Sequence, residues 1–189
     1  MTDVVGILLA AGSSQRFGAH KLMQPLADGT PVGVAAAGAL IAAVPNSVAV
    51  VRSGDNPMIE AFLSLGLKIV ENPFADQGMG ASLAAGVEAN AGADGWLITL
   101  ADMPWVQTET VRILAHSLQK GASMVAPVHD GRRGHPVGFA RHWGDRLRAL
   151  SGDEGARGLV SAHADELVLL NTSDAGVLKD IDRPHDLVG

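Results

Sequence analysis

Two cations, Arg16 and Lys21, lie in a stretch of small residues that follows the first apolar run of the chain, residues 4–9. An apolar run bounded by glycine and serine is typical of a buried strand in a parallel sheet. Small residues after such a strand can turn their backbone N–H groups toward an anion, and the two cations would neutralise its charge. The stretch therefore suits the phosphates of a nucleoside triphosphate. It fits equally well an ordinary turn between a strand and a helix that carries two surface cations.

Spacing excludes two common phosphate-binding loops. A P-loop has four residues between its glycines and then Lys followed by Ser or Thr. Here five residues separate Gly12 from Gly18, and Ala19 and His20 follow. The dinucleotide-binding pattern G-x-G-x-x-G is also absent from this stretch.

An acid, Asp102, follows another apolar run, residues 96–100, and stands shortly before Pro104. A carboxylate in this place is costly to desolvate unless it binds a cation or caps the following helix, and the sequence allows both roles. The seven histidines include no H-E-x-x-H pair, and the chain contains no cysteine. A zinc site is therefore not expected, and thiol chemistry is excluded.

Residues 9–21, L-A-A-G-S-S-Q-R-F-G-A-H-K, resemble the signature L-A-A-G-x-S-x-R-M-G-x-x-K of the molybdenum cofactor cytidylyltransferases. These enzymes are a branch of the MobA-like nucleotidyltransferases, and Phe17 replaces their usual Met. The resemblance implies that this loop holds a triphosphate and that Arg16 and Lys21 act in catalysis. The nucleotide-binding residues that it implies here are Leu9, Ala10, Ala11, Gly12, Ser13, Ser14 and Lys21.

Two acidic motifs resemble the metal ligands of the same family. L-A-D-M-P at residues 100–104 is similar to the motif whose Asp binds the magnesium ion that bridges the nucleotide phosphates, which assigns Asp102. D-I-D-R-P-H-D-L at residues 180–187 is similar to an ending whose D-x-P aspartate joins the metal, which assigns Asp182. Mg²⁺ takes one or two carboxylates together with phosphate oxygens and water. The alternative is that Asp182 only caps the turn that contains Pro184.

The remaining matches concern the base and the acceptor. Gly78, Gly80 and Ser82 stand where the family has its base-reading turn, although they also fit a simple tight turn. G-H-P-V and G-A-R resemble motifs on the acceptor side of the family, which assigns the acceptor-binding residues His135, Pro136 and Arg157. A solvated surface hairpin is the alternative for this segment.

The resemblance implies transfer of CMP from CTP to the phosphate of molybdopterin, with Mg²⁺ as cofactor and release of pyrophosphate. A general base is not required, because a phosphate monoester is already largely ionised at neutral pH. Molybdenum hydroxylases of the xanthine dehydrogenase type are the implied protein partners. The alternatives are a guanylyl- or uridylyltransferase acting on molybdopterin or a sugar phosphate, and a noncatalytic accessory protein that holds the cofactor.

The elements that must position these residues alternate along the chain. The pattern predicts strands at residues 4–9, 47–51, 67–70, 96–100 and 123–127 and helices at residues 33–43, 56–65, 83–89 and 109–119. This alternation predicts the α/β class, with a Rossmann-like, doubly wound and mostly parallel sheet. Ligands of such sheets bind beyond the carboxyl ends of the strands. Gly12, Asp55, Gly78 and Asp102 should therefore meet at one edge.

The alternation ends near Pro127. Residues 128–139 are predicted to form a small inserted β-hairpin lobe that the core sheet does not need. A helix at 141–150, a loop at 151–158 and short strands at 167–170 and 177–179 should follow. We expect residues 1–189 to form a single MobA-like nucleotidyltransferase domain.

The composition further limits the kinds of protein and of partner that fit this sequence. Hydrophobic residues make up 47% of the 189 residues and charged residues 18%, as in a globular protein. The formal net charge of −6 argues against nucleic acid as a partner. The longest apolar run, residues 32–44, is shorter than the roughly 20 residues of a membrane helix, and no signal pattern is found. We therefore expect a cytoplasmic protein that does not bind membranes.

Overall fold

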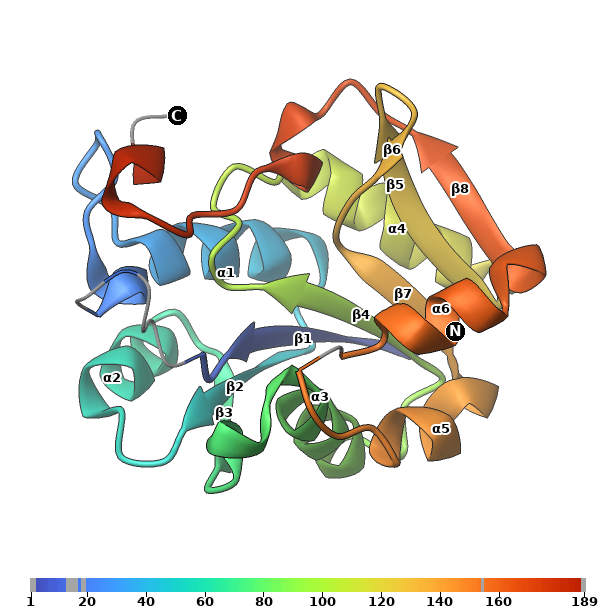
Figure 1. Cartoon of the computed structure of the whole chain (residues 1–189), viewed down its shortest axis with the longest axis horizontal. Helices are drawn as coiled ribbons and strands as arrows, with labels where there is room; N and C mark the ends of the chain where they lie inside the picture. Colours follow the sequence, from blue (N-terminus) through green and yellow to red (C-terminus); the bar gives the residue numbers. More distant parts are fainter. Residues whose placement is uncertain (1–2, 13–16, 18–19, 154, 188–189) are drawn as a thin grey trace.

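The computed structural model describes residues 3–12, 17, 20–153 and 155–187. Its centre is an eight-stranded sheet in the order β3-β2-β1-β4-β7-β5-β6, with β8 also paired to β5 (Figure 1). The strands of this described part are β1 Val4–Ala10, β2 Ser47–Arg52, β3 Lys68–Asn72, β4 Gly95–Leu100, β5 Met124–His129, β6 Arg132–Arg133, β7 Val137–Ala140 and β8 Leu167–Asn171.

Strand β1 lies in the parallel part of the sheet, between β2 and β4. All seven of its residues are buried, as expected for a strand that is covered on both faces. Successive side chains of a strand point to opposite faces. Leu8 accordingly joins one hydrophobic cluster and Leu9 the other.

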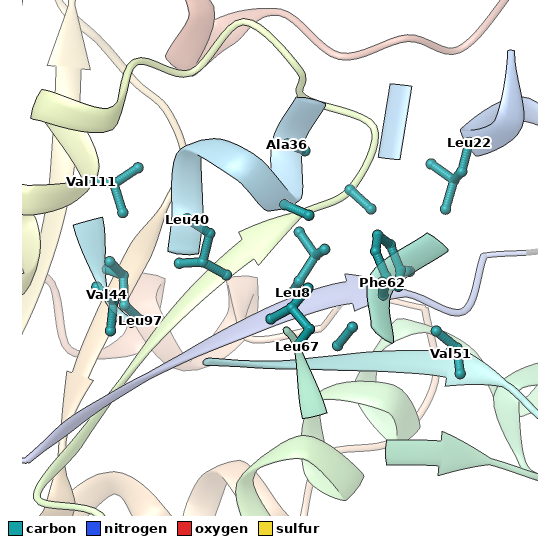
Figure 2. Packing of buried hydrophobic residues seen from close by; sticks show 14 of the residues in the cluster. Leu8, Leu22, Ala36, Leu40, Val44, Val51, Phe62, Leu67, Leu97 and Val111 are labelled. Carbon is teal, nitrogen blue, oxygen red and sulfur yellow. The ribbon is translucent and has the colours of Figure 1, made fainter. Parts of the chain in front are cut away.

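Helices cover both faces of the sheet, and the α-helices are α1 Val32–Ala43, α2 Asn56–Ser64, α3 Met79–Ala89, α4 Thr108–Gln119, α5 Gly144–Arg148 and α6 Arg157–Ala162. Leu40, Phe62 and Val111, from α1, α2 and α4, pack in the cluster of Leu8 (Figure 2), whereas residues of α3, α5 and α6 pack in the cluster of Leu9. The doubly wound α/β prediction is thus confirmed.

No helix in the described part of the chain has the length and apolarity needed to cross a bilayer. The 3₁₀ helices are η1 Lys21–Met23, η2 Ala75–Gln77, η3 Arg141–Trp143, η4 Ala164–Glu166, η5 Ala175–Leu178 and η6 Pro184–Leu187.

The inserted hairpin differs from the prediction in one respect. Its turn forms at Asp130 and Gly131, both with positive φ, but its returning strand β7 does not stand outside the sheet. Strand β7 lies between β4 and β5 and pairs antiparallel with both. The reason is burial, because Phe139 is fully covered opposite Trp96 of β4. The core sheet therefore needs this segment.

Two other segments also differ from the prediction. Helix α3 begins at Met79 rather than at Leu83, so the expected glycine turn forms the first turn of a helix. The predicted strand at residues 177–179 is wrong, because η5 occupies residues 175–178. Asp174 accepts the N–H of Gly176 there, and this local bond favours a helical turn over an extended chain.

Candidate active site

A cavity of about 580 Å³ opens at the carboxyl ends of the parallel strands. It is lined by the ends of β1, β2 and β4, by η1, η2 and the start of α3, and by residues of the segments that follow α5, β4 and η5. Of the four residues expected to meet at this edge, Gly12, Gly78 and Asp102 line the cavity. Asp55 instead contacts His20, with 2.8 Å between Oδ1 of Asp55 and Nε2 of His20. The other predicted residues in its lining are Leu9, Ala10, Ala11, Lys21, Ser82 and Asp182. Arg16, Ser13 and Ser14 lie outside the described residues.

Lys21 carries the positive charge at one end of this cavity. Its Nζ donates to Oδ2 of Asp102 at 2.8 Å and lies 3.9 Å from Oδ1 of Asp182. The side chain is only 13% exposed, and the neighbouring Leu22 is buried in the core. The ammonium is therefore held against two carboxylates rather than extended into water.

A third acid, Asp180, joins these two carboxylates. One carboxylate oxygen from each of Asp102, Asp180 and Asp182 lies within 4.8 Å of the others. Between the two C-terminal acids, Ile181 is fully buried and donates its backbone N–H to the carbonyl of Asp102 at 2.9 Å. Ile181 thus anchors the C-terminal segment to the end of β4. The signal that sequence reasoning missed was the alternation of acid, apolar residue and acid.

The acid cluster suits a divalent cation. Partial desolvation raises the pKa of the Asp180 carboxyl although the residue is exposed overall, and the charges of Asp102 and Asp182 raise it further. Grouped carboxylates repel one another, and a bound cation removes that repulsion. Carboxylate oxygens are also the ligands that hard divalent ions prefer. The donor set therefore fits Mg²⁺ or a similar ion.

The second aspartate of the C-terminal motif has a structural position. Oδ2 of Asp186 accepts the backbone N–H of Asp182 at 3.0 Å and that of Arg183 at 2.7 Å. These bonds lower the pKa of Asp186. In D-x-P-x-D, the first Asp faces the cluster and the second holds the turn that presents it.

The first turn of α3 is covered by the loop that follows α5. Gly78 has a φ of +101°, and a Cβ there would overlap the backbone of Gly152. The N–H of Gly80 donates to the carbonyl of Gly152 at 2.8 Å, and Gly80 is not among the described lining residues of the cavity. Ser82 lines the cavity, and its Oγ accepts from Asn72 at 3.1 Å. Both glycines therefore have a packing role at this turn.

The residues predicted on the acceptor side lie in two places in the structure. His135 and Pro136 line a smaller void beside Met103, and Arg157 is exposed at the start of α6. Nδ1 of His135 is buried without a hydrogen-bond partner in the described chain. Burial lowers the pKa of His135, Arg133 lowers it further, and the charge of Asp102 opposes the shift. His135 thus lies within electrostatic reach of the acid cluster, whereas Arg157 does not line the large cavity.

Sequence reasoning also missed Arg52 and Asp76. Arg52 ends β2, Asp76 lies in η2, and both line the large cavity. The described lining therefore contains two cations and four acids, namely Lys21, Arg52, Asp76, Asp102, Asp153 and Asp182. A polyanion bound among these carboxylates needs a divalent cation as a counter-charge.

The fold and the site define the class of the protein. A doubly wound sheet with a lysine and grouped aspartates beyond its strand ends suits a nucleotidyltransferase. The chain belongs to the family of MobA-like NTP transferase domains, whose profile matches residues 6–167. Both the family and the enzyme class implied by the sequence are thus confirmed.

Relatives match over nearly the whole chain but carry different names. Purine catabolism protein PucB of Bacillus subtilis is 29% identical, over 97% of this chain and 93% of its own length. Nicotine blue oxidoreductase of Paenarthrobacter nicotinovorans is also 29% identical, over 95% and 92%. Molybdenum cofactor cytidylyltransferase of Escherichia coli is 25% identical, over 100% and 95%.

Among solved structures, Rv0371c of Mycobacterium tuberculosis superposes with a TM-score of 0.83 at 26% identity, covering 98% of this chain and 95% of its own. A structure of that protein in complex with manganese superposes with a TM-score of 0.80 at 25% identity, covering 98% and 96%.

Proposed function

We propose that this nucleotidyltransferase transfers CMP from CTP to the phosphate of molybdopterin and releases pyrophosphate. The observation that carries the proposal is the contact of Lys21 with Asp102 and Asp182 beyond the ends of β1 and β4. That constellation supports binding of a metal-complexed triphosphate. The loop motif of residues 9–21 and the similarity to the E. coli cytidylyltransferase support the choice of CTP and molybdopterin.

In this mechanism an oxygen of the acceptor phosphate attacks the α-phosphorus of CTP. The bond from that phosphorus to the pyrophosphate oxygen breaks, and pyrophosphate leaves with the electron pair. Lys21 and Arg16 hold the triphosphate and neutralise its charge, so catalysis consists of positioning and charge stabilisation. Asp102 and Asp182, with Asp180 beside them, would hold Mg²⁺. A bound divalent ion would neutralise the phosphates; manganese in the related Rv0371c supports this assignment.

The other substrate contacts are proposals of the same kind. The backbone of residues 9–14, with Gly78, Gly80 and Ser82, would bind and read the nucleotide. His135, Pro136 and Arg157 would contact the pterin. Because Arg157 does not line the large cavity, its contact requires that α6 moves or that the substrate extends beyond the cavity. Delivery to molybdenum hydroxylases of the xanthine dehydrogenase type stays a prediction that none of the comparisons supports.

The test is release of pyrophosphate from CTP, GTP and UTP, each with and without molybdopterin, in the presence of Mg²⁺. We expect release only with CTP and molybdopterin together, and loss of release in Asp102→Asn. Turnover of GTP or UTP in preference to CTP would replace the proposal with the guanylyl or uridylyl alternative. No release with any nucleotide would favour the accessory protein.

A further inference from the structure

Arg52, at the end of β2, and its ion-pair partner Asp76 line the large cavity, whereas Asp102, which accepts from Lys21, follows β4. In the sheet, Leu9 of β1 pairs with Leu100 on one side and with Val50 on the other. Leu100 and Val50 therefore stand at the same level on either side of β1, and Asp102 and Arg52 follow them two residues further along the chain. Neighbouring strands are about 4.8 Å apart, so the two strand ends are separated by about 10 Å. This separation is comparable with the reach of a nucleotide from its phosphates to its base.

The phosphates belong at the Lys21 end of the cavity. Lys21 and the aspartates that would hold the metal are gathered there. A nucleotide bound in this orientation extends its base toward β2, η2 and the start of α3. Arg52 and Asp76 are the charged side chains of these elements in the described lining.

The Arg52–Asp76 ion pair contributes little to folding. Nη1 of Arg52 donates to Oδ1 of Asp76 at 2.7 Å, and the side chains are 33% and 82% exposed. An ion pair this open to water adds little stability. A guanidinium has five N–H donors and a carboxylate has two acceptor oxygens, so both groups keep hydrogen-bonding capacity beyond their mutual contact. The carboxylate of Asp76 therefore presents hydrogen-bond acceptors next to the N–H donors of Arg52.

We propose that Arg52 and Asp76 read the base and select a 4-aminopyrimidine over a 4-oxopyrimidine, that is, CTP over UTP. This inference rests on the proposed function, because it assumes a nucleotide in the cavity. Cytosine has an amino donor at N4 beside acceptors at N3 and O2. Asp76 accepts from N4, and Arg52 donates to N3 and O2. Uracil would place its O4 acceptor against the carboxylate and its N3–H against the guanidinium.

The test is calorimetric titration of the intact protein with CTP and with UTP, each in the presence of Mg²⁺. Asp76→Asn keeps the shape of the side chain but adds an amide donor, which can pair with O4 of uracil. We expect the ratio of CTP to UTP affinity to fall about tenfold in this variant. Arg52→Gln should weaken CTP binding about tenfold or more and UTP binding less.

The chain offers a matched control in the ion pair of Arg148 and Glu88, whose side chains are 34% and 71% exposed and are not among the described residues of the cavity. Glu88→Gln should leave both affinities unchanged. Equal losses for CTP and UTP in the Arg52 and Asp76 variants would overturn the inference, because contact with phosphate or ribose does not distinguish the bases. Unchanged affinities in both variants, or a wild type that binds UTP as tightly as CTP, would also overturn it. A wild type that binds neither nucleotide would instead refute the proposed function.

Discussion

Replacing Lys21 by Met tests how the acid cluster is held together. The ammonium lies 2.8 Å from a carboxylate oxygen of Asp102 and 3.9 Å from one of Asp182. Loss of a partner from a fully buried pair costs about 3–5 kcal/mol, and an exposed pair contributes about 0–1 kcal/mol. With Lys21 13% exposed and its partners 26% and 49% exposed, the cost should lie between these limits. We expect Lys21→Met to lower the free energy of unfolding by about 1–3 kcal/mol when no divalent ion is present.

The assay is urea denaturation of wild type and Lys21→Met, each in EDTA and in excess Mg²⁺. Because a divalent ion would also neutralise the carboxylates, Mg²⁺ should stabilise the variant more than it stabilises the wild type. Lys120→Met, at an exposed position after α4, controls for loss of a lysine as such. Equal stability of Lys21→Met and wild type in EDTA, with equal gains from Mg²⁺, would refute this account of the cluster.

Three further predictions concern residues that support the site. Asp174 is buried and accepts three hydrogen bonds, two of them from backbone N–H groups, so Asp174→Ala should cost about 3–5 kcal/mol in urea denaturation. Gly78→Ala should cost at least about 2 kcal/mol and weaken nucleotide binding, because φ is positive and the new Cβ would overlap Gly152. Burial lowers the pKa of His135, so the unfolded chain takes up this proton at a higher pH than the folded chain. Stability should therefore fall as the pH drops from about 7 to about 5, and His135→Gln should reduce that dependence.

Each of these predictions has an outcome that contradicts it. A loss below about 1 kcal/mol in Asp174→Ala would mean that water replaces the carboxylate without penalty. If Gly78→Ala bound nucleotide with wild-type affinity, the contact of Gly78 with the loop at residues 151–153 would have no role in nucleotide binding. For His135→Gln, the exposed His116→Gln serves as the control, and identical pH profiles in the two variants would exclude a buried, neutral His135.

Local patterns were enough to predict most strands and helices and the candidate residues at their ends, although not the start of α3 or the helical turn at residues 175–178. Strand β1 is apolar at every position except its glycine because both of its faces are covered. Such a continuous apolar run predicts a buried strand from the sequence alone. The small residues after it and Asp102 after β4 could be placed at one edge, because parallel strands end on the same side. These inferences need only short-range periodicity and the handedness of crossovers.

Only the tertiary structure decided which distant residues meet. Lys21 and Asp102 are 81 positions apart, and their contact depends on the register of β1 with β4, which periodicity does not encode. Asp180 joins the cluster because buried Ile181 binds the carbonyl of Asp102, and Arg52 reaches the cavity because β2 pairs beside β1. The place of β7 inside the sheet likewise follows from burial of Phe139 against β4. Such long-range contacts form through packing of the whole chain. The candidate residues could therefore be predicted one by one from the sequence, whereas their contacts with one another required the structure.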